Sequence, residues 1–140
     1  MKSNKENVSE EKAENITGKQ EVMRKIITGP TILLVSNLTE SRRYYNEVLG
    51  CEHDDCGHTS REGLFLLMYE ANNAADVKPI SSIPGGPPWD ILVYTNSHDE
   101  LLEEFKAKKA IIHTEIKVSD SGWKEFIIQD LDGYKIGFGG

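Results

Sequence analysis

Hydrophobic residues along the chain follow a pattern that occurs twice. Residues 32–37 read Ile-Leu-Leu-Val-Ser-Asn and residues 91–96 read Ile-Leu-Val-Tyr-Thr-Asn, so an apolar run ends each time in a hydroxyl residue and an asparagine. A charged segment follows both runs, and the second run begins 59 residues after the first. A repeat of this kind predicts two similar supersecondary modules that bury their apolar faces together.

The first copy predicts a module over about residues 26–77. Its apolar run has the composition of a buried strand. Asn37 then suits the N-cap of a helix, and Glu40 follows three residues later, as in a capping box. Residues 44–49 carry an apolar stripe, and Gly50 is typical of the residue that ends a helix. Further short strands are expected at residues 51–56 and 64–70.

The second copy predicts a module over about residues 89–140, after a linker at residues 78–88 that is rich in proline and glycine. Ser97 and Glu100 repeat the capping-box pattern, and lysines at the end of the expected helix suit the negative end of its dipole. The sequence Asp-Leu-Asp-Gly at residues 130–133 predicts a tight turn. The expected strands lie at residues 89–94, 111–118, 123–129 and 134–138.

Each half therefore reads as a strand, a helix and further strands. The pattern predicts a fold of the α+β class with two tandem βαβββ modules. Their strands are expected to form curved mixed sheets around a cleft, with the helices outside. Because helices cover only one face of each sheet, the other face stays open. We therefore expect a ligand to bind between the two modules, on the sheet faces that point away from the helices.

Composition and charge exclude several kinds of partner. The chain has 140 residues, a formal net charge of −7 and no basic cluster, which argues against nucleic acid and anionic membrane surfaces. No apolar run approaches the roughly 20 residues that span a bilayer, and two cysteines make no disulfide framework. The absence of a secretory signal pattern indicates a cytoplasmic protein. Residues 1–25 predict a disordered or loosely helical tail ahead of one domain at residues 26–140.

Two motifs resemble a known family. Residues 35–38 read Val-Ser-Asn-Leu and residues 41–50 read Ser-Arg-Arg-Tyr-Tyr-Asn-Glu-Val-Leu-Gly. They are similar to the V-x-D-L, S-x-x-F-Y and L-G signature of the vicinal oxygen chelate superfamily. Residues 129–136, Gln-Asp-Leu-Asp-Gly-Tyr-Lys-Ile, resemble its D-P-D-G-x-x-I tail. That superfamily includes glyoxalase I, bleomycin- and fosfomycin-resistance proteins and extradiol dioxygenases, and the resemblance covers about residues 26–138.

The resemblance implies a divalent metal ion in the cleft. Its usual ligands are a histidine at the start of the first strand of each module and a glutamate near the end of the last strand. The corresponding positions here carry Pro30, Trp89 and Gly137, and none of these ligates a metal through its side chain. We therefore expect neither a metal nor another cofactor, and we assign no catalytic residue.

The loss of the metal favours binding over catalysis, as in the metal-free resistance proteins of this superfamily, which sequester a toxic compound. We expect an apolar or planar small molecule in the cleft, contacted by Trp89, Tyr94, Tyr69, Trp123 and Asp90. Trp89 offers a flat surface for stacking. The competing interpretation of the aromatic residues is packing in the core or at an interface.

Two other functions stay open. One is a metal-dependent lyase, isomerase or dioxygenase-type enzyme with atypical ligands from Glu70, Asp90 or a partner subunit. If the alignment to the family's ligand positions is shifted by one residue, Thr31 replaces Pro30 and Asp90 replaces Trp89. The other is a non-catalytic module that acts through dimer formation. Members of the superfamily commonly pair, so the resemblance implies a homodimer.

A cluster of soft metal ligands needs a separate interpretation. Cys51, His53, Cys56 and His58 lie within eight residues of one another. A zinc ion would need a turn between the two pairs to collect all four side chains. The alternative is a set of polar residues on a strand and its hairpin.

Overall fold

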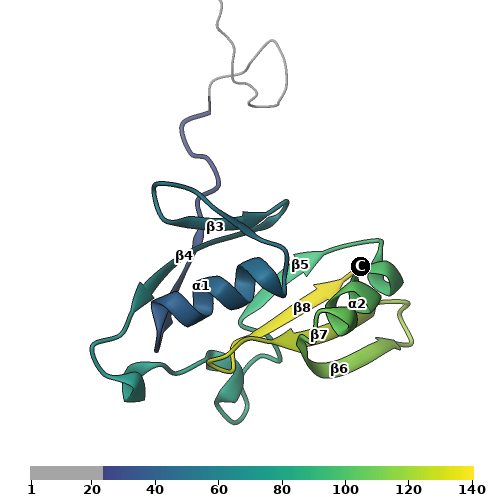
Figure 1. Ribbon diagram of the computed structural model, residues 1–140. Helices are drawn as coiled ribbons and strands as arrows, with labels where there is room; N and C mark the ends of the chain where they lie inside the picture. Colours follow the sequence, from purple (N-terminus) through teal and green to yellow (C-terminus); the bar gives the residue numbers. More distant parts are fainter. Residues whose placement is uncertain (1–23) are drawn as a thin grey trace, which may run out of the picture.

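The chain folds into two βαβββ modules joined by an irregular connection, as Figure 1 shows. The computed structural model describes residues 24–140. The first module consists of β1 (Thr31–Val35), α1 (Leu38–Glu47), β2 (Glu52–His53), β3 (His58–Arg61) and β4 (Leu64–Glu70). The second consists of β5 (Ile91–Tyr94), α2 (His98–Ala107), β6 (Ile111–Val118), β7 (Lys124–Gln129) and β8 (Lys135–Gly139). Two short 3₁₀ helices, η1 (Ala74–Asp76) and η2 (Ile80–Ser82), lie between them.

Nearly all of the predicted tail at residues 1–25 lies outside the described residues, so the tail and the domain boundaries stay predictions.

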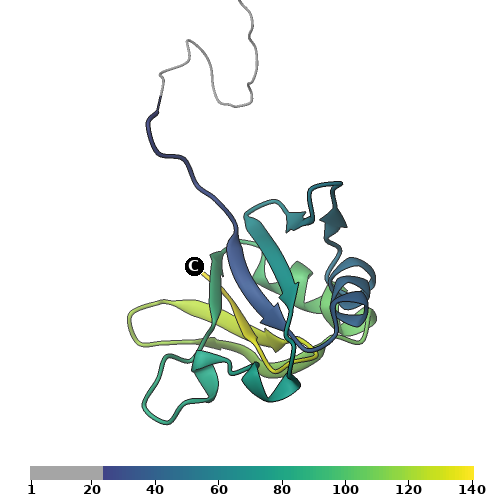
Figure 2. The ribbon, with the colours of Figure 1, turned by 90° about the vertical axis from the view of Figure 1, so that its left-hand side faces the viewer.

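The two sheets have the same strand order, which confirms the duplicated plan predicted from the sequence. The first sheet is ordered β1-β4-β3-β2 and the second β5-β8-β7-β6. In each, the first and last strands of the module run parallel and the other neighbours run antiparallel. The sheets are therefore mixed, and Figure 2 shows both helices on the same side of them.

The ends of the helices follow the prediction only in part. Asn37 caps α1, since its Oδ1 accepts a hydrogen bond of 2.9 Å from the backbone N–H of Glu40. Gly50 follows the helix with a φ of +79°, a conformation that glycine adopts without strain. Ser97 occupies the N-cap position of α2, but its hydroxyl makes no capping hydrogen bond. The predicted second capping box is therefore wrong.

The segment after α1 is more finely divided than predicted. Instead of one strand over residues 51–56, the chain forms the two-residue strand β2 and then turns back into β3. The N–H of Gly57 donates to the carbonyl of Asp54 at 3.2 Å, and Gly57 has a φ of +92°. Asp54 also accepts from the backbone N–H groups of Cys56 and His58. A turn that satisfies so many donors shortens the strand on either side of it.

The two modules share one hydrophobic core, on the side of the sheets that faces the helices. Leu33 and Val35 of β1 reach this core, as do Phe126 of β7 and Phe138 of β8. The rings of the two phenylalanines stack at 5.0 Å between centroids, and Phe105 of α2 packs against both. Because the core fills the helix side, the opposite faces of both sheets stay open.

Three tyrosines join the modules through their hydroxyl groups. Tyr45 of α1 donates to Oδ2 of Asp130 at 2.7 Å, and its side chain is fully buried. Tyr44 donates to the carbonyl of Gln129 at 2.8 Å. In the other direction, Tyr134 donates to the carbonyl of Leu34 at 2.6 Å. Residues of the β7–β8 turn are thereby held against β1 and α1.

Burial gives Asp130 an unusual proton affinity. The carboxyl is 2% exposed. Its Oδ1 accepts from the backbone N–H groups of Asp132 and Tyr134. Loss of solvent outweighs these hydrogen bonds and raises the pKa of Asp130 from 3.8 to about 6. The folded protein therefore binds a proton here at a pH where the unfolded chain has already released it.

We predict that this group makes the fold less stable as pH rises from about 4 to about 6. A pKa about two units above its unfolded value corresponds to at most about 3 kcal/mol of unfolding free energy, present below pH 4 and lost above pH 6. In the variant Asp130→Asn this component of the pH dependence disappears. Urea unfolding between pH 4 and 7 measures it, with Asp120→Asn as an exposed control. Equal pH profiles for Asp130→Asn and the wild type would contradict the assignment.

Candidate functional site

Two glycines of β8 shape the open face of the second sheet. The residues that alternate with Gly137 and Gly139 along this strand point into the core, so the glycines lie on the opposite face. A Cβ atom at Gly137 would lie 2.3 Å from Cδ1 of Trp89, and one at Gly139 would lie 2.2 Å from Cζ2 of Trp123. Both indoles therefore rest directly on the backbone of β8, and any larger residue would displace them.

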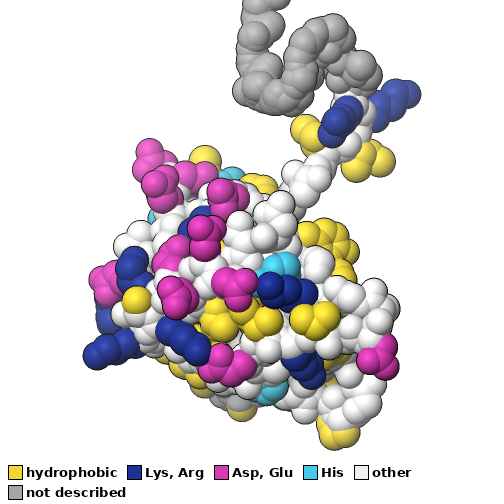
Figure 3. Space-filling view, turned by 90° about the vertical axis from the view of Figure 1, so that its right-hand side faces the viewer, with side chains coloured by type: hydrophobic (Ala, Val, Ile, Leu, Met, Phe, Trp, Pro, Cys, Tyr) yellow, Lys and Arg dark blue, Asp and Glu magenta, His cyan; other side chains and the backbone are white. Residues whose placement is uncertain are grey.

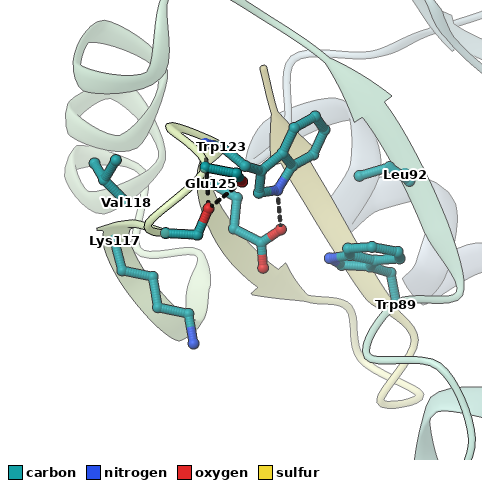
Figure 4. A pocket seen from close by; sticks show the side chains of 8 residues that line it. Trp89, Leu92, Lys117, Val118, Trp123 and Glu125 are labelled. Carbon is teal, nitrogen blue, oxygen red and sulfur yellow. Dashed lines mark hydrogen bonds between the residues drawn. The ribbon is translucent and has the colours of Figure 1, made fainter.

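The two indoles border a cavity of about 700 Å³, shown in Figure 4. Its lining comes from the second module alone and consists of Trp89, Leu92, Lys117, Val118, Ser119, Ser121, Trp123 and Glu125. We expected the site between the two modules of the chain. This cavity lies instead on the outer face of the second sheet. A smaller pocket of about 110 Å³ lies between the modules, where Leu49 and Leu64 face Leu101 and Phe105. The expected site between the modules therefore stays a prediction.

Glu125 of β7 places a carboxylate inside this cavity. The residue is 8% exposed, and its Oε1 accepts a hydrogen bond of 2.7 Å from Nε1 of Trp123. Nε1 of Trp89 is buried and has no hydrogen-bond partner. In Figure 4 the carboxylate lies below the indole of Trp123 and to the left of that of Trp89. The cavity thus combines two large aromatic surfaces with one negative group.

The two predicted tyrosines lie outside this cavity. Tyr94, at the end of β5, is 78% exposed and meets the ring of Trp123 edge-on at 6.0 Å between centroids. Tyr69, on β4 of the first module, is 56% exposed. Tyr94 therefore extends the aromatic surface of Trp123, and Tyr69 belongs to a different sheet.

Asp90 anchors the connection between the modules. Its Oδ1 accepts from the N–H of Ser81 at 3.0 Å, and its Oδ2 accepts from the hydroxyl of Ser81 at 2.5 Å and from the N–H of Lys135 at 2.8 Å. These bonds fix η2 against β8. Asp90 does not line the cavity, although the adjacent Trp89 does.

Sequence reasoning identified both tryptophans of the cavity but missed Glu125. A signal for it exists in the strand Lys-Glu-Phe-Ile-Ile-Gln, where Glu125 alternates with the buried Phe126 and so belongs to the open face. The loop residues Ser119 and Ser121 carry no such pattern.

Comparison with known proteins shows which fold this arrangement represents. No family model and no curated protein matches the chain. Among solved structures, a member of the glyoxalase/bleomycin resistance protein/dioxygenase superfamily from Sphaerobacter thermophilus matches with a TM-score of 0.61 and 14% identity, over 81% of this chain and 97% of that one. The chain has the vicinal oxygen chelate fold.

Two further solved structures support the same fold. UcmS2 matches with a TM-score of 0.65 and 12% identity, over 84% of this chain and 98% of that one. A glyoxalase-related enzyme from Fulvimarina pelagi matches with a TM-score of 0.57 and 16% identity, over 81% and 86% of the two chains. The resemblance seen in the two sequence motifs is therefore confirmed at the level of the fold.

The residues at the metal positions of the vicinal oxygen chelate fold do not suit a divalent ion. Pro30, Trp89 and Gly137 offer no side-chain ligand, and the indole of Trp89 occupies the space that a side chain at position 137 would need. Within residues 24–140, no three side chains of His, Cys, Asp or Glu gather in a group that could hold a metal.

The atypical ligands considered for an enzyme are engaged elsewhere. Glu70 accepts a hydrogen bond of 2.8 Å from the backbone N–H of Leu38, at the start of α1. Asp90 is bound to Ser81 and Lys135, as described above. Each carboxylate thus stabilises a local turn or helix end.

Both histidines of the cluster formed by Cys51, His53, Cys56 and His58 also make local contacts. The two ring nitrogens of His53 each lie 2.8 Å from an oxygen, one of Thr59 and one of Arg42. Nδ1 of His58 lies 2.9 Å from Oδ2 of Asp54. Cys51 is buried, and this burial raises the pKa of its thiol to about 11. These contacts favour the interpretation as polar residues on a strand and its hairpin.

The outer surface carries mixed charges. On the face shown in Figure 3, acidic and basic side chains are interspersed and hydrophobic side chains lie between them. That face has no continuous basic patch of the kind that binds phosphate backbones. None of the helices in residues 24–140 is long and apolar enough to cross a membrane.

The contact between Trp89 and β8 predicts the effect of filling the space at Gly137. We expect Gly137→Ala to push the indole away from the strand, to cost about 1–3 kcal/mol of unfolding free energy, and to shift the tryptophan emission to longer wavelength. Urea unfolding followed by fluorescence measures both effects. Gly63→Ala is the matched control, because a Cβ atom there meets nothing within 4 Å. Unchanged stability and emission in Gly137→Ala would show that Trp89 does not rest on β8.

Proposed function

We propose that the protein binds a planar, largely apolar small molecule on the open face of its second sheet, without a metal ion and without turnover. The observation that carries this proposal is the cavity of about 700 Å³ bordered by Trp89 and Trp123. Its volume falls within the roughly 300–1,000 Å³ of typical small-molecule sites. The vicinal oxygen chelate fold supports the same class of function.

The construction of the cavity favours flat ligands. Each indole is backed by a glycine of β8 and therefore presents a supported surface to a ligand. Leu92 and Val118 add apolar contacts, and apolar atoms make up most of the exposed lining. Aromatic stacking contributes about 0.5–1.5 kcal/mol per pair beyond the area that it buries. Two such surfaces in one cavity select planar rings over flexible chains.

Ligand binding should depend on both indoles. We expect planar aromatic compounds to raise the melting temperature and to perturb tryptophan fluorescence, and Trp89→Ala and Trp123→Ala each to weaken binding by about tenfold, which corresponds to about 1.4 kcal/mol. Ile26→Ala, at an exposed residue ahead of β1, serves as the control. A ligand that binds all variants equally would place the site elsewhere. Stoichiometric nickel, zinc or manganese in the purified protein would overturn the metal-free proposal.

We further propose that the protein forms a homodimer through the open face of the first sheet. On β1, Leu33 and Val35 point into the core, so Ile32 and Leu34 project on the other side, where they are 66% and 36% exposed. Tyr69 on the neighbouring β4 adds an exposed ring. Exposed apolar groups that lie together on a sheet commonly mark an interface.

A second copy is the occupant that best fits this face. The cavity is open and is lined by the second module alone, while the first module presents apolar groups that line no cavity. Pairing of two copies would let the first sheet of one cover the cavity of the other. The small-molecule site would then be completed by the partner.

The dimer proposal predicts a change in oligomeric state. We expect sedimentation velocity to show a dimer for the wild type and a monomer for Ile32→Asp, because a charge at the centre of an apolar interface loses its solvation. Ile83→Asp is the control, since Ile83 is similarly exposed but lies in the connection between the modules. A monomeric wild type, or equal dissociation of both variants, would refute the proposed interface.

A further inference from the structure

The cavity contains a carboxylate, that of Glu125. Binding of a neutral apolar molecule would not explain why this charged group is there. The residue is 8% exposed and stands on the open face of β7 among aromatic and apolar groups. Withdrawing a carboxylate from water costs several kcal/mol unless a cation or several hydrogen bonds replace the solvent. Within residues 24–140, the only hydrogen bond to its side chain comes from Nε1 of Trp123.

The protein itself supplies no cation to this carboxylate within the described residues. Lys117 is its cross-strand partner in the β6–β7 ladder and also lines the cavity. The ammonium group of Lys117 nevertheless makes no ion pair with Glu125 among residues 24–140, and Figure 4 draws no interaction between the two side chains. Lys124, the adjacent residue on β7, pairs instead with Asp99 at 3.1 Å.

The geometry leaves one carboxylate oxygen available to a ligand. Oε1 is held by Trp123 at 2.7 Å, which fixes the orientation of the group. Oε2 has no hydrogen-bond partner in the described part of the chain, yet it is not among the fully buried polar atoms without partners, so it keeps contact with the cavity space. A ligand that stacks on the indoles brings its ring atoms next to this oxygen.

The aromatic groups around Glu125 favour the same charge. The faces of indole rings carry negative potential and attract cations, by about 0.5–2 kcal/mol per contact. Trp89 and Trp123 border the cavity, and Tyr94 meets Trp123 at its outer edge. A positive charge delocalised over a planar ring would meet the indole faces and the carboxylate together.

We propose that the ligand is a planar aromatic cation, such as an N-alkylated heteroaromatic ring, and that Glu125 neutralises its charge. This inference rests on the proposed binding function and specifies the chemical class that the site prefers. Glu125 is thereby the residue that determines charge specificity, while the two indoles supply the stacking surfaces.

Two probes of the same shape separate charge from stacking. The 1-methylquinolinium cation and 1-methylnaphthalene differ only in the positive ring nitrogen. Isothermal titration of the full-length wild type is expected to show at least about tenfold tighter binding of the cation. In Glu125→Gln, which keeps an acceptor for the N–H of Trp123, this preference is expected to disappear while binding of the neutral probe stays the same. Glu115→Gln, at an exposed glutamate of β6 outside the cavity, should leave both affinities unchanged.

Each outcome distinguishes the two proposals. Equal affinity of the wild type for the two probes, or a cation preference that persists in Glu125→Gln, overturns the role of Glu125 and leaves the proposed binding function intact. Failure of both probes to bind overturns both proposals. The tryptophan emission spectrum of Glu125→Gln, measured without ligand, verifies that the indoles keep their places, so that lost binding is not mistaken for misfolding.

Discussion

The position of the β7–β8 turn against the first module determines which surfaces of this protein are free. Hydroxyl groups of tyrosines cross the boundary between the modules in both directions, and the buried pair of Tyr45 and Asp130 lies at its centre. The helix sides of both sheets are thereby joined in one core, and the cavity bordered by Trp89 and Trp123 lies on an outer face. The open cavity is a consequence of how the modules are joined.

On the second sheet, the absence of two side chains is as important as the presence of two others. Gly137 and Gly139 leave gaps in the surface of β8, and the indoles of Trp89 and Trp123 fill them. A rigid indole that rests on backbone loses little conformational entropy when a ligand stacks on it. The proposed ligand would therefore meet surfaces that are already in place.

The sequence was sufficient for the fold but only partly for the site. The repeated strand-to-helix pattern and the Asp-Leu-Asp-Gly turn predicted both modules, because apolar periodicity and turn chemistry are local properties. The role of Tyr45 was missed, since an apolar stripe on a helix does not reveal which hydroxyl meets a carboxylate 85 residues away. The contacts of Asp90 were missed for a similar reason, because its partners Ser81 and Lys135 become neighbours only in three dimensions.

The contact between Trp89 and Gly137 also restricts how this cavity can change. A histidine in place of Trp89 would add one metal ligand but leave the gap above Gly137 unfilled. A glutamate in place of Gly137 would collide with the indole, because even its Cβ atom would lie 2.3 Å from the ring. Neither substitution alone creates a metal centre, and each damages the existing surface. The two positions are coupled, so a route from this cavity to a metal-dependent site requires both to change together.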